Sequence, residues 1–170
     1  NRGLIHTADD AQIRFTQEIV DNTGGTIIAD GQFSVINLGA GTIVSGGTIS
    51  AGTNGGIYAE RGSFLRDIHI ISTGAIGTAP NAVDPRDYGL YGDISLGGTV
   101  ELDGQMNPVV NSKLTLGDVT LINHGIVWAP AGGGIDIGGN ATLDGGGYVI
   151  FNSSPFYQAV MQAQLRDDID

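Results

Sequence analysis

Short apolar runs separated by glycine and polar turn residues dominate the hydrophobic pattern of this chain. Apolar pairs stand at Ile27-Ile28, Val35-Ile36, Ile43-Val44 and Ile57-Tyr58, with Gly, Asn or Asp between them. Brief runs of this kind, rich in β-branched side chains and bounded by turn residues, are typical of short strands. A helix needs about 10–12 residues without such interruptions. The pattern therefore predicts an all-β fold.

One strand sequence recurs along the chain. Gly-Gly-Thr-Ile at 24–27 returns at 46–49 and, with Val in place of Ile, at 97–100, and the first two copies begin 22 residues apart. A strand that repeats at such an interval indicates a chain wound into coils, each stacked on the one before. We therefore expect a β-solenoid rather than a β-sandwich.

Two further markers support this winding. An acidic residue followed by alternating apolar positions begins at Asp67, Asp93 and Asp118, and Leu-Asp-Gly occurs at 102–104 and 143–145. The intervals agree on a coil of about 20–26 residues. If the coils stack, the three aspartates would lie about 5 Å apart along one face.

A polar residue follows an apolar pair at four places, and these residues are Asn37, Ser72, Asn123 and Asn152. In a stacked coil such residues can mark one corner, where Asn and Ser side chains hydrogen-bond to their neighbours above and below. We interpret them as a structural ladder.

Two segments depart from the repeat. Residues 78–91 contain Pro80 and Pro85, and proline cannot donate to a strand ladder, so we expect a loop there. Ser154-Pro155 is a helix-start signal, and the apolar positions that follow have helical spacing.

We predict a leading segment at 1–21, a solenoid of about six coils at 22–153, and a short capping helix with an acidic tail at 154–170.

The chain resembles right-handed parallel β-helix regions of bacterial surface adhesins and autotransporter-like passengers. The resemblance rests on the Gly-Gly-Thr-Ile strands, on the run Asn-Ala-Thr-Leu-Asp-Gly-Gly-Gly at 140–147, and on the Asn and Ser residues interpreted as corners. The resemblance covers about residues 22–153. It implies a right-handed parallel β-helix and an extracellular or bacterial cell-surface location. Polysaccharide lyases and phage tailspikes share this fold, so the resemblance does not imply one activity.

The composition of the chain limits the classes of partner that it can bind. The net charge is −11, from 18 acidic and 7 basic residues, so phosphate backbones would be repelled and nucleic acid is not an expected partner. The absence of cysteine excludes disulfides and thiolate metal sites. No apolar run reaches the length of a membrane span. We expect a cell-surface glycan or protein as the partner, or self-association.

The loop at 78–91 holds the candidate ligand-binding residues. Tyr88 and Tyr91 offer flat faces for a sugar ring, and Asp84, Arg86 and Asp87 can hydrogen-bond to its hydroxyl groups. The alternative interpretation is that the tyrosines pack on the solenoid and the arginine pairs with a neighbouring aspartate.

A calcium site is the one cofactor that the sequence suggests, and only weakly. Asp136 and Asp144 lie among glycines in a way that resembles the calcium-binding nonapeptide repeats of RTX proteins, but they are eight residues apart, not nine. We expect no other cofactor. The three histidines, His6, His69 and His124, show no ligand spacing and are interpreted as ordinary surface or corner residues.

These observations predict a non-enzymatic, structural or adhesive section of a secreted or cell-surface protein, which displays loops to cells, glycans or matrix. One alternative is a polysaccharide lyase or hydrolase that uses the stacked Asp67, Asp93 and Asp118. Lys113 is the only lysine and the arginines do not recur with the coil, which disfavours a lyase. Another alternative is a phage tailspike-like receptor-binding fibre.

Overall fold

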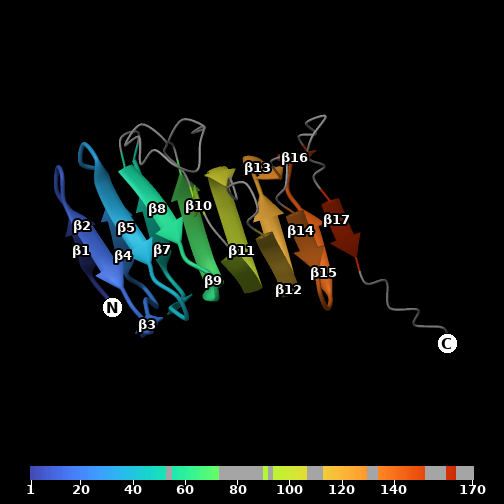
Figure 1. Cartoon of the computed structure of the whole chain (residues 1–170), viewed down its shortest axis with the longest axis horizontal. Helices are drawn as coiled ribbons and strands as arrows, with labels where there is room; N and C mark the ends of the chain where they lie inside the picture. The colour runs from blue at the N-terminus through green and yellow to red at the C-terminus, as the bar shows by residue number, and fades with distance from the viewer. Residues whose placement is uncertain are drawn as a thin grey trace.

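The chain folds as an all-β parallel solenoid, seen from the side in Figure 1. The computed structural model describes residues 1–52, 55–72, 90–91, 94–106, 113–129, 134–151 and 160–163. The strands are β1 (Leu4–Thr7), β2 (Gln12–Phe15), β3 (Ile19–Asp21), β4 (Thr26–Ala29), β5 (Ser34–Leu38), β6 (Ile43–Ser45), β7 (Thr48–Ala51), β8 (Gly55–Ala59), β9 (Ser63–Ser72), β10 (Leu90–Tyr91), β11 (Ile94–Met106), β12 (Lys113–Asn123), β13 (Ile126–Ala129), β14 (Gly134–Ile137), β15 (Ala141–Asp144), β16 (Tyr148–Phe151) and β17 (Val160–Ala163).

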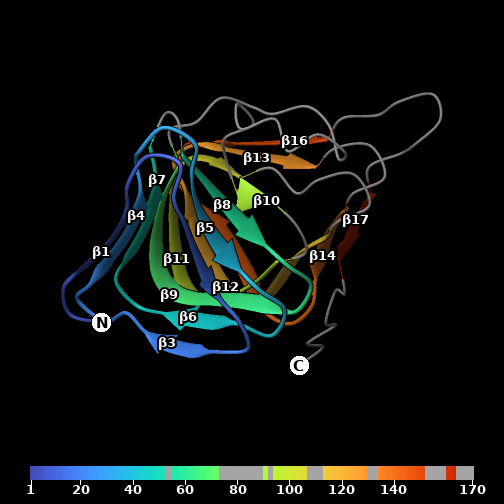
Figure 2. The same cartoon turned by 60° about the vertical axis from the view of Figure 1, so that its left-hand side comes forward.

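Three parallel faces surround the core, and Figure 2 shows them around the stack. The first face contains β1, β4 and β7, then the second half of β9, the middle of β11, the second half of β12, and β15. The second contains β2, β5, β8, β10, the end of β11, β13 and β16. The third contains β3, β6, the first parts of β9, β11 and β12, then β14 and β17.

The register on the first face fixes the length of each turn. One column of partners runs through Leu4, Thr26, Thr48, His69, Glu101, Ile122 and Asp144. Successive members are 21 or 22 residues apart, except for the 32 residues from His69 to Glu101. The predicted coil length is confirmed. The longer interval contains residues 78–91, where the sequence predicts a loop. Residues 78–89 lie outside the described residues, and the prediction is wrong for Leu90–Tyr91, which form β10 and pair with β8 and β11.

The repeated tetrapeptide stacks as predicted in its first two copies. Thr26 pairs with Thr48, and Ile27 with Ile49. The third copy is displaced by two residues, because the column that contains Thr48 continues to Glu101 and not to Thr99. Since side chains alternate every two residues along a strand, this displacement leaves each residue on its original side of the sheet.

The core consists of apolar ladders that run along the three faces. The inward ladders are Ile27, Ile49, Ile70 and Leu102 on the first face, Ile36, Ile57 and Met106 on the second, and Val44, Leu65, Leu96 and Leu116 on the third. All of these side chains are buried. Burial of one such side chain contributes about 1.5–3 kcal/mol, so the ladders supply much of the stability.

A fully buried asparagine holds one corner between successive turns. The Asn22 Nδ2 donates to the carbonyl oxygens of Gly25 and Gly46 at 3.2 Å each, and to that of Thr48 at 3.1 Å. These bonds connect the Asn22 side chain to backbone carbonyl groups of its own turn and of the next one. Asn22 is a corner residue that the sequence reasoning missed.

The predicted Asn and Ser residues do not form a single ladder, although Asn123 has the expected corner role: its Nδ2 donates to the Tyr148 carbonyl of the next turn at 3.1 Å, and its Oδ1 accepts from the Gly125 amide at 3.0 Å. Asn37 lies within β5 on the second face, where it pairs with Arg14 and Tyr58, whereas Ser72 and Asn123 end strands of the first face. Asn152 lies outside the described residues. An apolar pair followed by a polar residue occurs on more than one face, so this short pattern does not identify a corner.

Both ends of the chain differ from the prediction. Residues 4–21, expected to lead into the solenoid, form β1–β3 and already pair with β4–β6 as a turn of the stack. The whole stack nevertheless has about five turns, not the six expected.

The predicted capping helix is wrong where the structure describes it. Val160–Ala163 form β17, which extends β14 in parallel. Pairing with an existing strand edge here overrides a weak helical spacing. Among the described residues, no helix has the length and apolar character needed to cross a membrane.

The first prediction concerns the ladder on the first face. Ile49→Ala removes a fully buried side chain, whereas Ile28→Ala removes a partly buried one on the outer side of the same face. We expect Ile49→Ala to lower the free energy of unfolding by about 2–5 kcal/mol, and Ile28→Ala by clearly less. Urea unfolding followed by circular dichroism measures both, and equal losses would contradict the assigned inward side.

The second prediction compares two glycines with positive φ. Gly41 (φ +76°) has open space where a Cβ would lie, but a Cβ on Gly47 (φ +65°) would lie 2.1 Å from the carbonyl oxygen of Asn22. Gly41→Ala should cost about 1–2 kcal/mol, which is the cost of the left-handed backbone alone. Gly47→Ala adds a clash with backbone and should cost about 2–5 kcal/mol. The same urea experiment checks the difference, and a smaller loss at Gly47 would refute the close contact between these turns.

Candidate functional site

The outer side of the first face carries a group of four ionisable side chains, here called the acid–histidine cluster: His69, Glu101, Asp103 and His124. His69 in β9 is the register partner of Glu101 in β11. Asp103 lies two residues after Glu101 and therefore on the same side of the sheet. His124 directly follows β12, at the end of the next strand. Parallel stacking brings together residues that are up to 55 positions apart.

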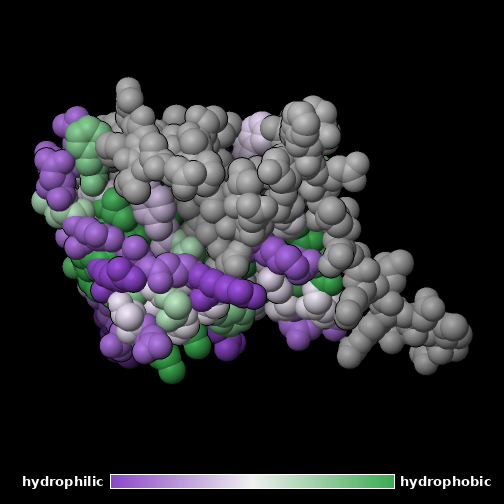
Figure 3. Space-filling view, viewed as in Figure 1, coloured by the Kyte–Doolittle hydropathy of each residue, from purple (hydrophilic) through white to green (hydrophobic). Residues whose placement is uncertain are grey.

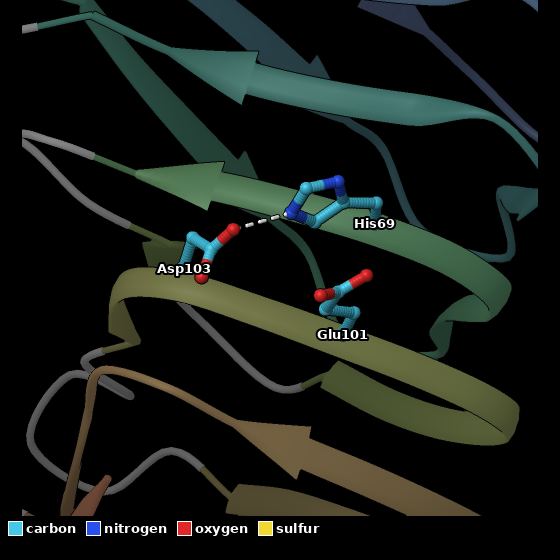
Figure 4. Close-up of side chains that lie close together, drawn as sticks. All are labelled: His69, Glu101 and Asp103. Atoms are coloured by element: carbon cyan, nitrogen blue, oxygen red, sulfur yellow. Dashed lines mark hydrogen bonds and ion pairs between the residues drawn. The ribbon is translucent and has the colours of Figure 1, made fainter. Parts of the chain in front are cut away.

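Asp103 connects the two histidines. The Nε2 of His69 lies 2.7 Å from one carboxylate oxygen of Asp103, and the Nδ1 of His124 lies 3.2 Å from the other. The same Nδ1 lies 3.6 Å from a carboxylate oxygen of Glu101. Figure 4 shows His69, Glu101 and Asp103 directed toward one another across β9 and β11.

The charge of Asp103 is stabilised by these neighbours. The hydrogen bond from His69 is the main cause that holds the pKa of the Asp103 carboxyl below its usual value, and the bond from His124 adds to it, while partial burial acts in the opposite direction. The four side chains are half-buried, with exposed fractions between 32% and 44%. Asp103 is thus a fixed anion that faces two imidazole rings.

Apolar side chains border the cluster along the sheet. Ile71 is the register partner of Asp103, and Ile122 is the register partner of Glu101. Both are partly buried. They restrict the water around the polar atoms and so strengthen the electrostatic interactions there. The ligand atoms of His69, Glu101 and Asp103 all lie within 4.8 Å of one another, as in sites that hold a metal ion.

A shallow groove of about 530 Å³ lies beside this cluster, on neighbouring turns. Thr99, Thr120 and Thr142 are register partners on β11, β12 and β15, and these three residues line the groove as one column. Asp118 and Asn140 also line it. We call this surface the threonine groove. Among the described residues that line it, Asp118 is the one ionisable group.

Asp67 and Asp118 lie within β9 and β12, and each binds the backbone of the next turn at a corner. Asp67 Oδ1 accepts a hydrogen bond from the Thr99 amide at 3.0 Å, and Asp118 Oδ1 accepts one from the Asn140 amide at 3.0 Å. The bond from Thr99, followed by that from Arg66, lowers the pKa of Asp67. Both aspartates have positive φ, which aspartate tolerates better than most residues.

The predicted stack of Asp67, Asp93 and Asp118 does not form. Asp67 and Asp118 belong to corners two turns apart, since β11 lies between β9 and β12. Asp93 lies outside the described residues, but the next residue, Ile94, pairs with Ser63 and Leu114 rather than with the residues that follow the other two aspartates. The similar local sequences therefore occupy different positions in the turn.

The other predicted site residues are not brought together by the described part of the structure. Asp84, Arg86, Asp87 and Tyr88 lie outside the described residues, and Tyr91 is described only as part of the backbone of β10. Their role in ligand binding stays a prediction.

The two predicted calcium ligands have other partners. The Lys113 Nζ lies 3.0 Å from an Asp136 carboxylate oxygen, and Asp144 accepts a hydrogen bond from the Gly145 amide. Neither aspartate belongs to a group of three or more metal-binding side chains within the described ranges. Calcium at this pair stays a prediction.

The histidines were interpreted separately, and for two of them this missed their shared partner. His69 does point outward, as expected, but it meets Asp103 together with His124. One signal was present in the sequence: His124 follows Asp103 by 21 residues, which is one turn. The stretch of sequence between His69 and Asp103 includes the one turn that is longer than the others. The regular coil length therefore could not reveal their contact.

Figure 3 shows hydrophilic residues in a band across the described part of one side of the stack, with hydrophobic residues along the margins. Such a surface is typical of a solenoid that keeps its apolar ladders inside and presents polar side chains outward. No protein-family model, curated protein or solved structure matches this chain, so the site is interpreted from its own geometry.

Proposed function

We propose that this β-solenoid is a non-enzymatic, adhesive section of a secreted or cell-surface protein, and that it binds neutral glycans through its outer surface. The observation that carries the proposal is the threonine groove, which extends over successive turns of a rigid stack. Threonine hydroxyls, the Asn140 amide and the Asp118 carboxylate are groups that hydrogen-bond to sugar hydroxyls.

The charge of the chain supports neutral rather than acidic glycans. With a net charge of −11, the protein repels polyanions, and the groove has an aspartate but no basic residue among its described lining residues. An openly accessible, shallow surface also suits a long polymer that lies across several turns better than it suits a small enclosed substrate.

The arrangement of carboxylates favours binding over cleavage. Glycoside hydrolysis requires two carboxyl groups on opposite sides of one scissile bond. Asp67 and Asp118 instead each bind a backbone amide of the next turn. A structural role for Asp67 and Asp118 at the corners supports the adhesive function over the hydrolase or lyase alternative.

The third prediction tests this function with a panel of neutral and acidic polysaccharides. We expect retention of neutral polysaccharides in affinity electrophoresis, without release of new reducing or unsaturated chain ends. Thr120→Val keeps the side-chain shape but removes the hydroxyl at the middle of the groove. The loss of one hydrogen bond of about 1 kcal/mol corresponds to an affinity about fivefold lower.

Thr115→Val is the matched control, because Thr115 lies in the same strand, is also partly buried, and faces outward away from the groove. Equal effects of both substitutions would argue against the groove as the binding surface. Release of chain ends would replace the adhesive function with the enzymatic one. The double variant Tyr88→Ala and Tyr91→Ala tests the predicted loop contacts in the same assay.

A further inference from the structure

We propose that the acid–histidine cluster is a binding site for Zn²⁺ or a similar divalent transition metal, which links successive turns of the solenoid. This inference goes beyond glycan binding and does not depend on it. It rests on the four side chains of His69, Glu101, Asp103 and His124, which meet on the outer side of the first face.

The distances fit a small tetrahedral site. Zinc binds imidazole nitrogen and carboxylate oxygen at about 2.0–2.2 Å, so neighbouring ligand atoms of a tetrahedron lie about 3.3–3.5 Å apart. The separations from Asp103 to His69 and to His124 are 2.7 and 3.2 Å, and that from His124 to Glu101 is 3.6 Å. The ligand atoms of His69, Glu101 and Asp103 lie within 4.8 Å of one another, and His124 contacts Asp103 and Glu101, so side-chain rotation is needed to bring all four ligands around one ion.

The strand register holds the ligands in place before a metal binds. His69 and Glu101 are direct partners on adjacent parallel strands, which lie about 4.8 Å apart. Asp103 is on the same strand as Glu101 and the same side. His124 follows Asn123, the partner of Leu102, and its own amide donates to the Leu102 carbonyl at 2.9 Å. Three consecutive strands of the face therefore supply ligands.

The ligand types select the metal. Imidazole nitrogens favour Zn²⁺, Cu²⁺ and Ni²⁺, whereas Ca²⁺ requires six to eight oxygen ligands. Two neutral imidazoles with two carboxylates also compensate the double charge of the ion. The net charge of −11 draws cations toward the surface as a whole, but among the described residues His69, Glu101 and Asp103 are the one group of three metal-binding side chains within 4.8 Å, and His124 contacts two of them.

The chain contains a matched pair that lacks the rest of this arrangement. His6 in β1 contacts, through its Nε2, the carboxylate of Asp30, which directly follows β4 on the same face, and both side chains are about half exposed. Within the described ranges this pair belongs to no group of three metal-binding side chains. His6 therefore controls for weak zinc binding by one exposed histidine beside one aspartate.

The fourth prediction is tested by isothermal titration of the metal-free full chain with zinc chloride. We expect one Zn²⁺ per chain. Because loss of an outer-shell partner alone lowers metal affinity about 10–100-fold, loss of a direct ligand should lower it at least 10-fold. His69→Ala, His124→Ala and Asp103→Asn should each do so, whereas His6→Ala should leave stoichiometry and affinity unchanged. Excess calcium chloride should not displace the zinc.

Thermal unfolding gives a second measurement. A ligand that binds only the folded chain raises the unfolding midpoint, so zinc should raise it in the wild-type chain and in His6→Ala, and not in the cluster variants. Asp103→Asn preserves side-chain shape, and its circular dichroism spectrum shows whether the fold is kept. Absence of zinc binding by the wild-type chain would overturn the inference, as would equal affinity losses in His6→Ala and His69→Ala.

Discussion

Parallel hydrogen bonding between successive turns is the constraint on which the rest of this structure depends. Each strand pairs with the equivalent strand of the turn before it. Residues in one column of register partners therefore all point to the same side of the sheet, either into the core or outward. A slip of one residue would expose every apolar ladder, whereas a slip of two preserves it. The third Gly-Gly-Thr copy is displaced by two residues and still places Val100 inside.

Because of this parallel pairing, backbone groups at the corners need hydrogen-bond partners other than the neighbouring strands. Strand hydrogen bonds stop where the chain changes direction, and the backbone groups there need other partners. Asn22 supplies them from inside the stack, and Asp67 and Asp118 supply them from outside, each in a left-handed conformation. Asp67 and Asp118, which recur in the sequence, thus have a structural role in the winding.

The sequence predicted the winding because the first two Gly-Gly-Thr-Ile copies are spaced by one turn and stack in register, whereas the later markers give the approximate turn length without occupying equivalent positions. It did not predict the C-terminal strand: the spacing of Val160 and Ala163 fits a helix, and only the nearby edge of β14 makes a strand the better solution. The Asn/Ser ladder failed for a related reason, because an apolar pair before a polar residue occurs on more than one face.

The acid–histidine cluster was harder to predict, since register is a tertiary property. Asp103 and His124 are one turn apart in the sequence, so their contact could have been predicted from the coil length. His69 joins them across the one long interval, whose length only the structure supplies. A regular repeat thus predicts the columns on each side of an insertion but not the alignment across it.

The winding also has a mechanical consequence. Neighbouring turns are only about 4.8 Å apart along the stack, yet a turn of 22 residues spans about 75 Å when fully extended. A force applied to the two ends of the chain would break one turn's hydrogen bonds at a time, beginning at an edge. Each step would release roughly fifteen times the length that the turn occupied, so the stack would act as an extensible tether rather than as a brittle rod.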